Sequence, residues 1–212
     1  MVMSAGSSAI ASSAAYHFVT VTTATPEIYF DLGSPYAYLA LERAESVLGQ
    51  PATLVPVLVG AIFGWRGHGS WALTPERTAG MAEIGRRARE YGLPPMDWPA
   101  DWPANALVAM RCATWAARQR GLPEFARIVG RRQWTQAADI ADLGVLAACA
   151  REAGLDAEAM LEAIRTPELK EQLRATTERA FQDGVRGVPT VRVGERLFFG
   201  DDRLEQARTA MA

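Results

Sequence analysis

The spacing of apolar and polar residues separates the chain into strand-like ends and a helical middle. Residues 28–32 form a short apolar and aromatic run, which predicts a buried strand. A helix is expected over 35–48, and a second strand over 53–59. Pro56 marks a strand end, a bulge or an edge, because proline cannot donate to a strand ladder. A strand, helix and strand of these lengths predict a parallel pair joined by a crossover.

The middle of the chain, residues 74–184, shows only helical periodicity. A segment rich in proline and tryptophan, residues 93–103, interrupts it and predicts an irregular loop. The expected helices cover 74–91, 105–120, 123–134, 142–153, 157–164 and 167–183, with Asn105 capping the second of them. This stretch predicts an all-helical insertion.

Strand patterns return near the end of the chain. Residues 187–193 alternate apolar and polar positions, and residues 196–199 form a second run after a Gly-Glu turn. The two runs predict a hairpin. Asp201 or Asp202 is expected to cap a last helix.

The order of elements predicts an α/β protein with a thioredoxin-like core, β-α-β then β-β-α, split by a large helical insertion. We expect the core to comprise residues 27–62 and 184–212, and the insertion residues 63–183. Residues 1–26 are rich in Ser, Ala and Thr and are expected to form a disordered arm.

Composition and charge narrow the range of partners and cellular compartments that we expect for the protein. The net charge of −2 gives no field that favours nucleic acid or an anionic membrane, and no apolar run is long enough to span a bilayer. Cys112 and Cys149 form no C-x-x-C pair and no metal-binding pattern, so we expect two buried thiols and no metal. These features, with no secretory signal, favour the reducing cytoplasm.

Ser34 is the first candidate for chemistry. It precedes Pro35 at the start of the first helix, just after a parallel strand, where ligands bind in open α/β sheets. Free N–H groups and the helix dipole stabilise an anion there. The alternative is that Ser34 only caps the helix.

Pro189 opens the strand after Gly187 and Val188 and is the second candidate. A proline here is explained if the bond before it is cis, which leaves a free backbone edge for a ligand. The alternative is a trans proline at the start of a strand.

Together these motifs resemble the kappa-class glutathione transferases and the 2-hydroxychromene-2-carboxylate isomerases, within the DsbA-like branch of the thioredoxin superfamily. The resemblance is carried by residues 30–40, 184–190 and 197–204. It is weaker over 56–63 and 105–111 and at Trp134, and it extends from Glu27 to the C-terminus.

The resemblance implies a site for glutathione. Ser34 would hydrogen-bond the glutathione sulfur and keep it as thiolate. Val188, before Pro189, would pair its backbone with the cysteinyl part, and Asp202, with Asp201, would hold the γ-glutamyl ammonium. It also implies a small-molecule substrate and a homodimer.

The resemblance also implies an acceptor pocket for the substrate. Asn105 and Arg111 would lie near this pocket. The aromatic walls would come from Tyr36, Phe63 and Trp65.

One segment departs from the family. Residues 76–80 replace a lysine-rich helix start that helps to anchor an acidic group. Arg77 is the available substitute, although arginine and lysine are not interchangeable in such sites. The thiol is therefore glutathione or another low-molecular-weight thiol.

The leading hypothesis is a glutathione-dependent cis-trans isomerase of an unsaturated aromatic acid. A kappa-like glutathione transferase is the first alternative, and a thiol-binding module without turnover is the second. Dithiol redox chemistry is disfavoured, because Ser34 and Ala37 occupy the positions of the usual cysteine pair.

Overall fold

The strands of the described residues form one mixed four-stranded sheet. The computed structural model describes residues 25–211, so nearly all of the expected arm over 1–26 lies outside the described residues. The strands are β1 (Glu27–Phe30), β2 (Thr53–Pro56), β3 (Thr190–Val193) and β4 (Arg196–Phe199). Their order is β2-β1-β3-β4, with β1 parallel to β2 and antiparallel to β3, and β4 antiparallel to β3. The expected parallel pair and hairpin are confirmed.

Every regular element of the described chain between β2 and β3 is helical, as the sequence predicts. The α-helices are α1 (Pro35–Leu48), α2 (Val59–Trp65), α3 (Arg77–Glu90), α4 (Leu107–Arg118), α5 (Leu122–Thr135), α6 (Leu143–Glu152), α7 (Ala157–Ala163), α8 (Pro167–Gln182) and α9 (Leu204–Thr209). Two 3-10 helices, η1 (Trp71–Leu73) and η2 (Asp201–Arg203), complete the set within residues 25–211. The α/β core with a helical insertion is therefore confirmed.

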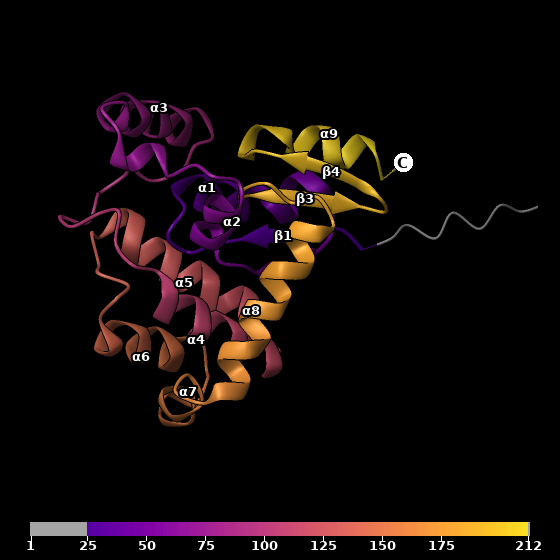
Figure 1. The fold of residues 1–212 in the computed structure, drawn as a ribbon. Helices are drawn as coiled ribbons and strands as arrows, with labels where there is room; N and C mark the ends of the chain where they lie inside the picture. Colours follow the sequence, from indigo (N-terminus) through magenta and orange to yellow (C-terminus); the bar gives the residue numbers. More distant parts are fainter. Residues whose placement is uncertain (1–24, 212) are drawn as a thin grey trace, which may run out of the picture.

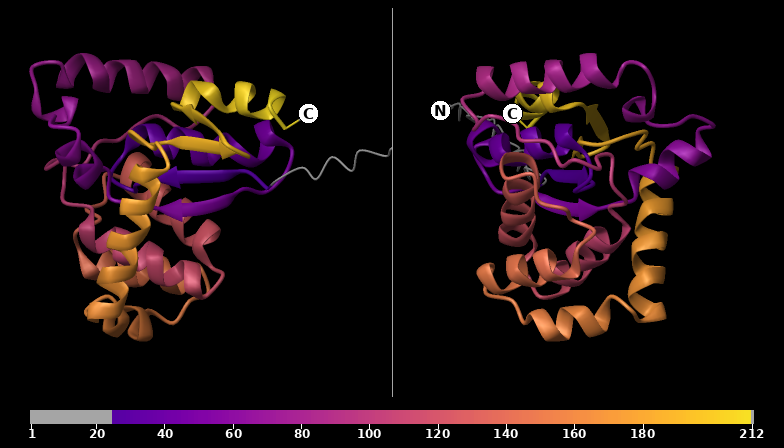
Figure 2. Two further views of the ribbon diagram at one scale, coloured as in Figure 1. Left: turned by 45° about the vertical axis from the view of Figure 1, so that its right-hand side comes forward. Right: turned by 90° about the vertical axis from the view of Figure 1, so that its left-hand side faces the viewer.

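The sheet lies between helices on both faces (Figures 1 and 2). In these views α3 and α9 lie above the sheet and α4–α7 form a block below it, with α8 running from that block to the sheet. Ile28 of β1 packs with Leu204 of α9 on one face, and Tyr29 packs with Ile62 of α2 and Ala180 of α8 on the other. Alternate side chains of β1 thus serve opposite faces.

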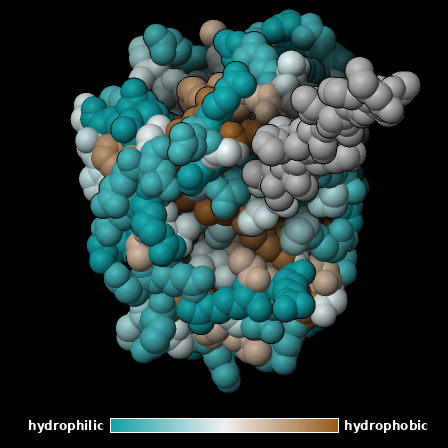
Figure 3. Space-filling view, turned by 90° about the vertical axis from the view of Figure 1, so that its right-hand side faces the viewer, coloured by the Kyte–Doolittle hydropathy of each residue, from teal (hydrophilic) through white to brown (hydrophobic). Residues whose placement is uncertain are grey.

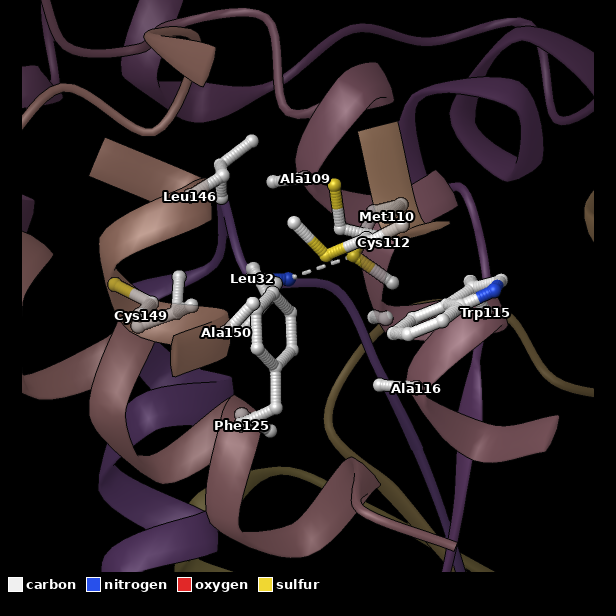
Figure 4. Packing of buried hydrophobic residues seen from close by; sticks show 14 of the residues in the cluster. Leu32, Ala109, Met110, Cys112, Trp115, Ala116, Phe125, Leu146, Cys149 and Ala150 are labelled. Atoms are coloured by element: carbon white, nitrogen blue, oxygen red, sulfur yellow. Dashed lines mark hydrogen bonds between the residues drawn. The ribbon is translucent and has the colours of Figure 1, made fainter. Parts of the chain in front are cut away.

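The largest hydrophobic cluster joins the end of β1 to the helical block (Figure 4). Leu32 contributes its side chain, and its N–H lies 3.1 Å from the sulfur of Met110 on α4. Cys112 and Cys149, on α4 and α6, are buried there as free thiols, and burial raises the pKa of Cys112 to about 12. The prediction that both are buried thiols is confirmed.

The second strand is shorter than the sequence predicts. β2 ends at Pro56 instead of residue 59, and Val59 begins a helix, α2. The strand ends at the proline, one of the roles expected for Pro56, and the Val59 N–H at the start of α2 donates to Asp31 Oδ2 at 2.9 Å. The carboxylate satisfies a free N–H at the start of α2, which the local sequence does not reveal.

The expected cap on the last helix is absent. Residues 201–203 form η2, and α9 begins at Leu204 after Arg203, which makes no side-chain cap bond. The Asp201 carboxylate instead accepts hydrogen bonds from Arg87 at 2.9 Å and from Tyr91 at 3.0 Å, both from the end of α3. A tertiary ion pair replaces the local cap.

The described surface is mostly hydrophilic on the side shown in Figure 3, where hydrophobic residues show between polar ones near the middle. None of the helices within residues 25–211 has the length and apolar character needed to cross a membrane. The same residues contain no cluster of three or more His, Cys, Asp or Glu side chains suited to a metal ion.

Candidate functional site

A cavity of about 470 Å³ opens beyond the carboxyl end of β1. It lies between the start of α1, the start of α2 and the loop that leads into α4. This is the position in which open α/β sheets bind ligands. Of the residues proposed from the sequence, the cavity brings together Ser34, Tyr36, Phe63, Asn105 and Val188.

Ser34 is both a helix cap and part of the cavity wall. Its Oγ accepts a hydrogen bond from the Ala37 N–H at 3.3 Å, and its backbone is extended, as a cap requires. Pro35 follows at the first helical position. A hydroxyl that accepts one hydrogen bond still carries its own hydrogen, which is available to a ligand. The two interpretations of Ser34 are therefore compatible.

The start of α1 favours an anion at Ser34. The helix dipole places partial positive charge there, and the first N–H groups of a helix have no partner within it. Ser34 adds a hydroxyl donor to the same point of the cavity. A thiolate bound here would be stabilised relative to a thiol, because hydrogen bonds and positive potential lower the pKa of the group that loses the proton.

Asp31 also lines the cavity, and the sequence argument missed it. Its side chain is buried, and burial raises the pKa of the carboxyl to about 6, although N–H groups of Val59 and Gly33 act in the opposite direction. An acidic residue inside the apolar run 28–32, three positions before the candidate serine, was the signal that could have revealed it.

Tryptophans build one aromatic wall. Trp71 lies 6.1 Å from Tyr36 and 5.5 Å from Trp102, ring centroid to ring centroid, and all three line the cavity. Trp98 extends this group of aromatic rings, and its ring centroid lies 4.7 Å from that of Trp102. The proline- and tryptophan-rich loop over 93–103 was recognised as irregular, and its aromatic content was the available sign of a functional loop.

Six proposed residues lie outside the cavity lining, and three of them are far from it in the chain or turned to other partners: Trp65, Arg77 and Arg111. Trp65 is partly exposed and packs on Phe181, with the ring centroids 5.3 Å apart. Arg77 donates from Nη2 to the Trp102 carbonyl at 2.6 Å, and this hydrogen bond helps to hold Trp102 in the aromatic wall. Arg111 is half-buried on α4, and its Nε has no hydrogen-bond partner.

Pro189, Asp201 and Asp202 are likewise absent from the lining, although Val188 and Phe199, which are close to them in the chain, belong to it. The bond between Val188 and Pro189 is cis, as the sequence predicts, and the Pro189 carbonyl accepts from the Gly200 N–H at 2.9 Å. Asp201 is buried with both carboxylate oxygens engaged, by Arg87 and Tyr91. The Asp202 side chain is half exposed.

Comparisons with protein families and solved structures agree with the thioredoxin-like fold. Residues 26–212 match a family described as the DsbA-like thioredoxin domain. The chain is 30% identical to 2-hydroxychromene-2-carboxylate isomerase of Sphingobium xenophagum, covering 86% of this chain and 95% of the relative. It is 30% identical to glutathione S-transferase kappa 1 of Homo sapiens, covering 85% and 88%. A solved structure of 2-hydroxychromene-2-carboxylate isomerase superimposes with a TM-score of 0.79 at 21% identity, covering 88% and 94%.

Proposed function

Because the chain belongs to the DsbA-like thioredoxin domain family, and its cavity presents a serine where a helix begins, we propose that it is a glutathione-dependent isomerase of an unsaturated aromatic acid. Both 30%-identical relatives are enzymes by name, an isomerase and a glutathione transferase. The observation that carries the proposal is Ser34, whose hydroxyl lines an aromatic-walled cavity at the positive end of α1.

The cavity suits a thiol cofactor. When bound, glutathione supplies a thiolate that adds reversibly to a conjugated double bond, so that the bond rotates as a single bond and the cofactor is regenerated. The role of Ser34 is to donate a hydrogen bond to the sulfur and hold it unprotonated at neutral pH. Val188 and Pro189, which lead into β3, would align the cysteinyl part.

The γ-glutamyl ammonium requires a free carboxylate. Asp202 meets this requirement better, because its side chain is half exposed and its oxygens lie 4.0 Å from Arg87 and 3.8 Å from Arg203, beyond hydrogen-bond distance. Asp201 is already hydrogen-bonded to Arg87 and Tyr91. We therefore assign the ammonium contact to Asp202 and a supporting role to Asp201. Arg77 faces the Trp102 carbonyl, so its contribution to the site is to support the aromatic wall.

The substrate would occupy the aromatic side of the cavity. Tyr36, Phe63, Trp71 and Trp102 offer ring faces and edges to a flat aromatic compound. Asn105 lies just before α4, and its Oδ1 accepts a hydrogen bond from the Leu107 N–H at 2.9 Å. Its amide N–H groups are left to donate to a ligand. Such a donor suits a substrate oxygen. Trp65 and Arg111 would act from outside the lining.

A glutathione transferase is the second candidate, supported by the identity to the kappa-class relative. The same serine and cavity serve either reaction, and only the fate of the thiol differs. The described chain offers no reactive sulfur for dithiol redox chemistry, because Ser34 cannot form a mixed disulfide and the two cysteines are buried.

The deciding experiment follows substrate and thiol together. Purified protein is mixed with glutathione and 2-hydroxychromene-2-carboxylate, and the ultraviolet spectrum and the free thiol are measured in parallel. An isomerase changes the spectrum at constant thiol, whereas a transferase consumes one thiol per turnover. Thermal shifts with several cellular thiols identify the cofactor. Thiol binding without turnover on a panel of unsaturated aromatic acids would instead establish a binding module.

A further inference from the structure

Asp31 connects two separate walls of the cavity. Its Oδ1 accepts a hydrogen bond from the Gly33 N–H at 2.9 Å, and its Oδ2 accepts one from the Val59 N–H at 2.9 Å. Its own carbonyl accepts from the Ser34 N–H at 3.0 Å. One residue thus binds the loop that presents Ser34 and the start of α2, which are 25 positions apart in the chain.

The two segments depend on this residue for their relative position. Gly33 and Ser34 line the cavity from the start of α1, and Leu58 and Val59 line it from the start of α2. Leu58, the residue that precedes α2, makes no side-chain cap bond, so the Asp31 carboxylate acts as the cap of α2 from a distance. Losing it would remove this side-chain link between the α2 wall and the serine loop and leave the start of α2 held by the Leu58 N–H bond to Thr177 Oγ1 at 3.1 Å.

We propose that Asp31 is the positioning residue of the cavity, and that its ionised carboxylate clasps the α2 wall to the Ser34 loop in the form that binds the thiol cofactor. The inference rests on the proposed function, because it concerns the same cavity. It assigns a reason for a buried carboxylate that makes no salt bridge among the described residues.

The clasp requires the ionised form. A carboxylate offers two accepting oxygens, whereas a carboxylic acid turns one of them into a donor and leaves one of the two N–H groups without a partner. The carboxyl is buried and its pKa lies near 6. Affinity for the cofactor is therefore expected to fall as the pH drops through about 6.

Other groups near Asp31 do not account for such a change. Tyr36 shares the cavity, and a small void on the far side of Asp31 is lined by Tyr38 and Glu42 of α1 and by Arg127 of α5. The segments of α2 and α4 that line either space carry no titratable side chain. His68, whose ring lies 5.0 Å from that of Phe63, is exposed and requires a control.

The test measures binding of S-methylglutathione by calorimetry between pH 5 and 8, because this analogue has no thiol to titrate. The wild type should lose about tenfold in affinity as the pH falls through about 6, the size of one charge-assisted hydrogen bond. Asp31→Asn should bind with the weaker affinity at every pH. His68→Gln should keep the wild-type profile.

A second pair of variants isolates the Val59 N–H. Val59→Pro removes this donor while proline remains favourable at the first position of α2, and Val59→Ala removes most of the side chain but keeps the donor. Relative to Val59→Ala, the proline variant should bind about tenfold more weakly at pH 8. Its acid limb should lie at higher pH, because the carboxylate has lost a stabilising donor.

The clasp is also tested without ligand, so that its failure differs from failure of the proposed function. In amide NMR spectra of the wild type, the Gly33 and Val59 signals should titrate near pH 6, and in Asp31→Asn they should not. A wild type that binds no glutathione analogue refutes the proposed function, and these signals then decide the clasp alone. Amide signals that do not titrate, a flat affinity profile in a wild type that binds, or an acid limb retained in Asp31→Asn would overturn the clasp.

Discussion

Ser34 both caps α1 and lines the cavity, and one substitution separates the two roles. Ser34→Ala removes the hydroxyl but leaves the helix dipole and the cavity. A free thiol titrates near 8.5, and a hydroxyl donor together with the dipole lowers this pKa by about 2 units. The variant should raise the pKa of bound glutathione by about 1 unit and slow turnover by up to about tenfold. Ultraviolet titration of the thiolate in the binary complex measures the shift.

Ser70 provides a matched control for this experiment. It also lines the cavity and also accepts a backbone N–H, that of Ala72 at 3.2 Å, at the start of η1. Ser70→Ala should therefore cost a similar amount of cap stability, about 1 kcal/mol, without moving the thiolate pKa. Equal thiolate pKa values in wild type and Ser34→Ala would show that Ser34 is only a cap.

The buried carboxyl of Asp31 should leave a signature in stability against pH. Its folded pKa of about 6 exceeds the ordinary aspartate value of 3.8, so the folded state binds the proton more tightly than the unfolded state. The stabilising contribution is fully present below about pH 4 and is lost as the pH rises to about 6. It amounts to about 3 kcal/mol.

Asp31→Asn isolates this contribution, because the difference in unfolding free energy between variant and wild type cancels the other titrating groups. That difference should move by about 3 kcal/mol in favour of the variant between pH 4 and pH 7. Urea unfolding at several pH values measures it. A difference independent of pH would place the carboxyl pKa near its ordinary value.

At the scale of elements, α3 supports the aromatic wall through a close contact at Gly80. A Cβ built on Gly80 would lie 2.2 Å from the Trp71 ring, so this position admits no side chain unless the ring moves. Gly80→Ala should destabilise the protein by about 1–3 kcal/mol through overpacking, although alanine is the better helix former. Displacement of Trp71 should also raise KM for the aromatic substrate, which steady-state kinetics would show.

Gly85 offers the comparison on the same helix. A Cβ there would meet only the end of the Arg89 side chain, at 3.8 Å. Gly85→Ala should therefore stabilise the protein by about 0.5–1 kcal/mol and leave KM unchanged. If Gly80→Ala behaved in the same way, Trp71 would not be held by this contact.

At the scale of the whole molecule, an ion pair joins α3 to the C-terminal segment. Arg87 donates to Asp201, whose side chain is only 2% exposed, and Tyr91 binds the other oxygen. Arg87→Ala leaves a buried carboxylate without its cation, so it should cost about 3 kcal/mol in unfolding free energy at neutral pH. It should also weaken thiol binding, since Asp202 follows Asp201 directly. Urea unfolding and calorimetry measure the two effects.

Arg86, the preceding residue, forms its ion pairs with Glu83 and Glu90 on the exposed surface of α3. Arg86→Ala should therefore change stability by less than about 1 kcal/mol. If Arg87→Ala and Arg86→Ala lost similar amounts of unfolding free energy, the ion pair between Arg87 and Asp201 would contribute no more to stability than a surface ion pair.

The sequence by itself determined the elements whose signals act within a few residues. Ser34 and Pro35 start α1, Gly49 ends it in a left-handed conformation with a φ of 74°, and the turn at Gly194 joins β3 to β4. The helical period likewise predicted α3 to α8 to within three residues at their ends, whereas α2 and η1 were not predicted. Ser34, at the junction of a strand and a helix, could therefore be proposed as a site residue.

Only the tertiary structure decided the features that depend on residues far apart in the chain. α2 begins at Val59, within the run that predicted a strand, where Asp31 supplies a distant acceptor, and Asp201 leaves its cap position because Arg87 reaches it from α3. The aromatic wall forms because Trp71 and Trp102 meet across the cavity. Local preferences are worth a few tenths of a kcal/mol to about 1 kcal/mol, and satisfying a buried charge or N–H group is worth more, so long-range partners prevail wherever the two conflict.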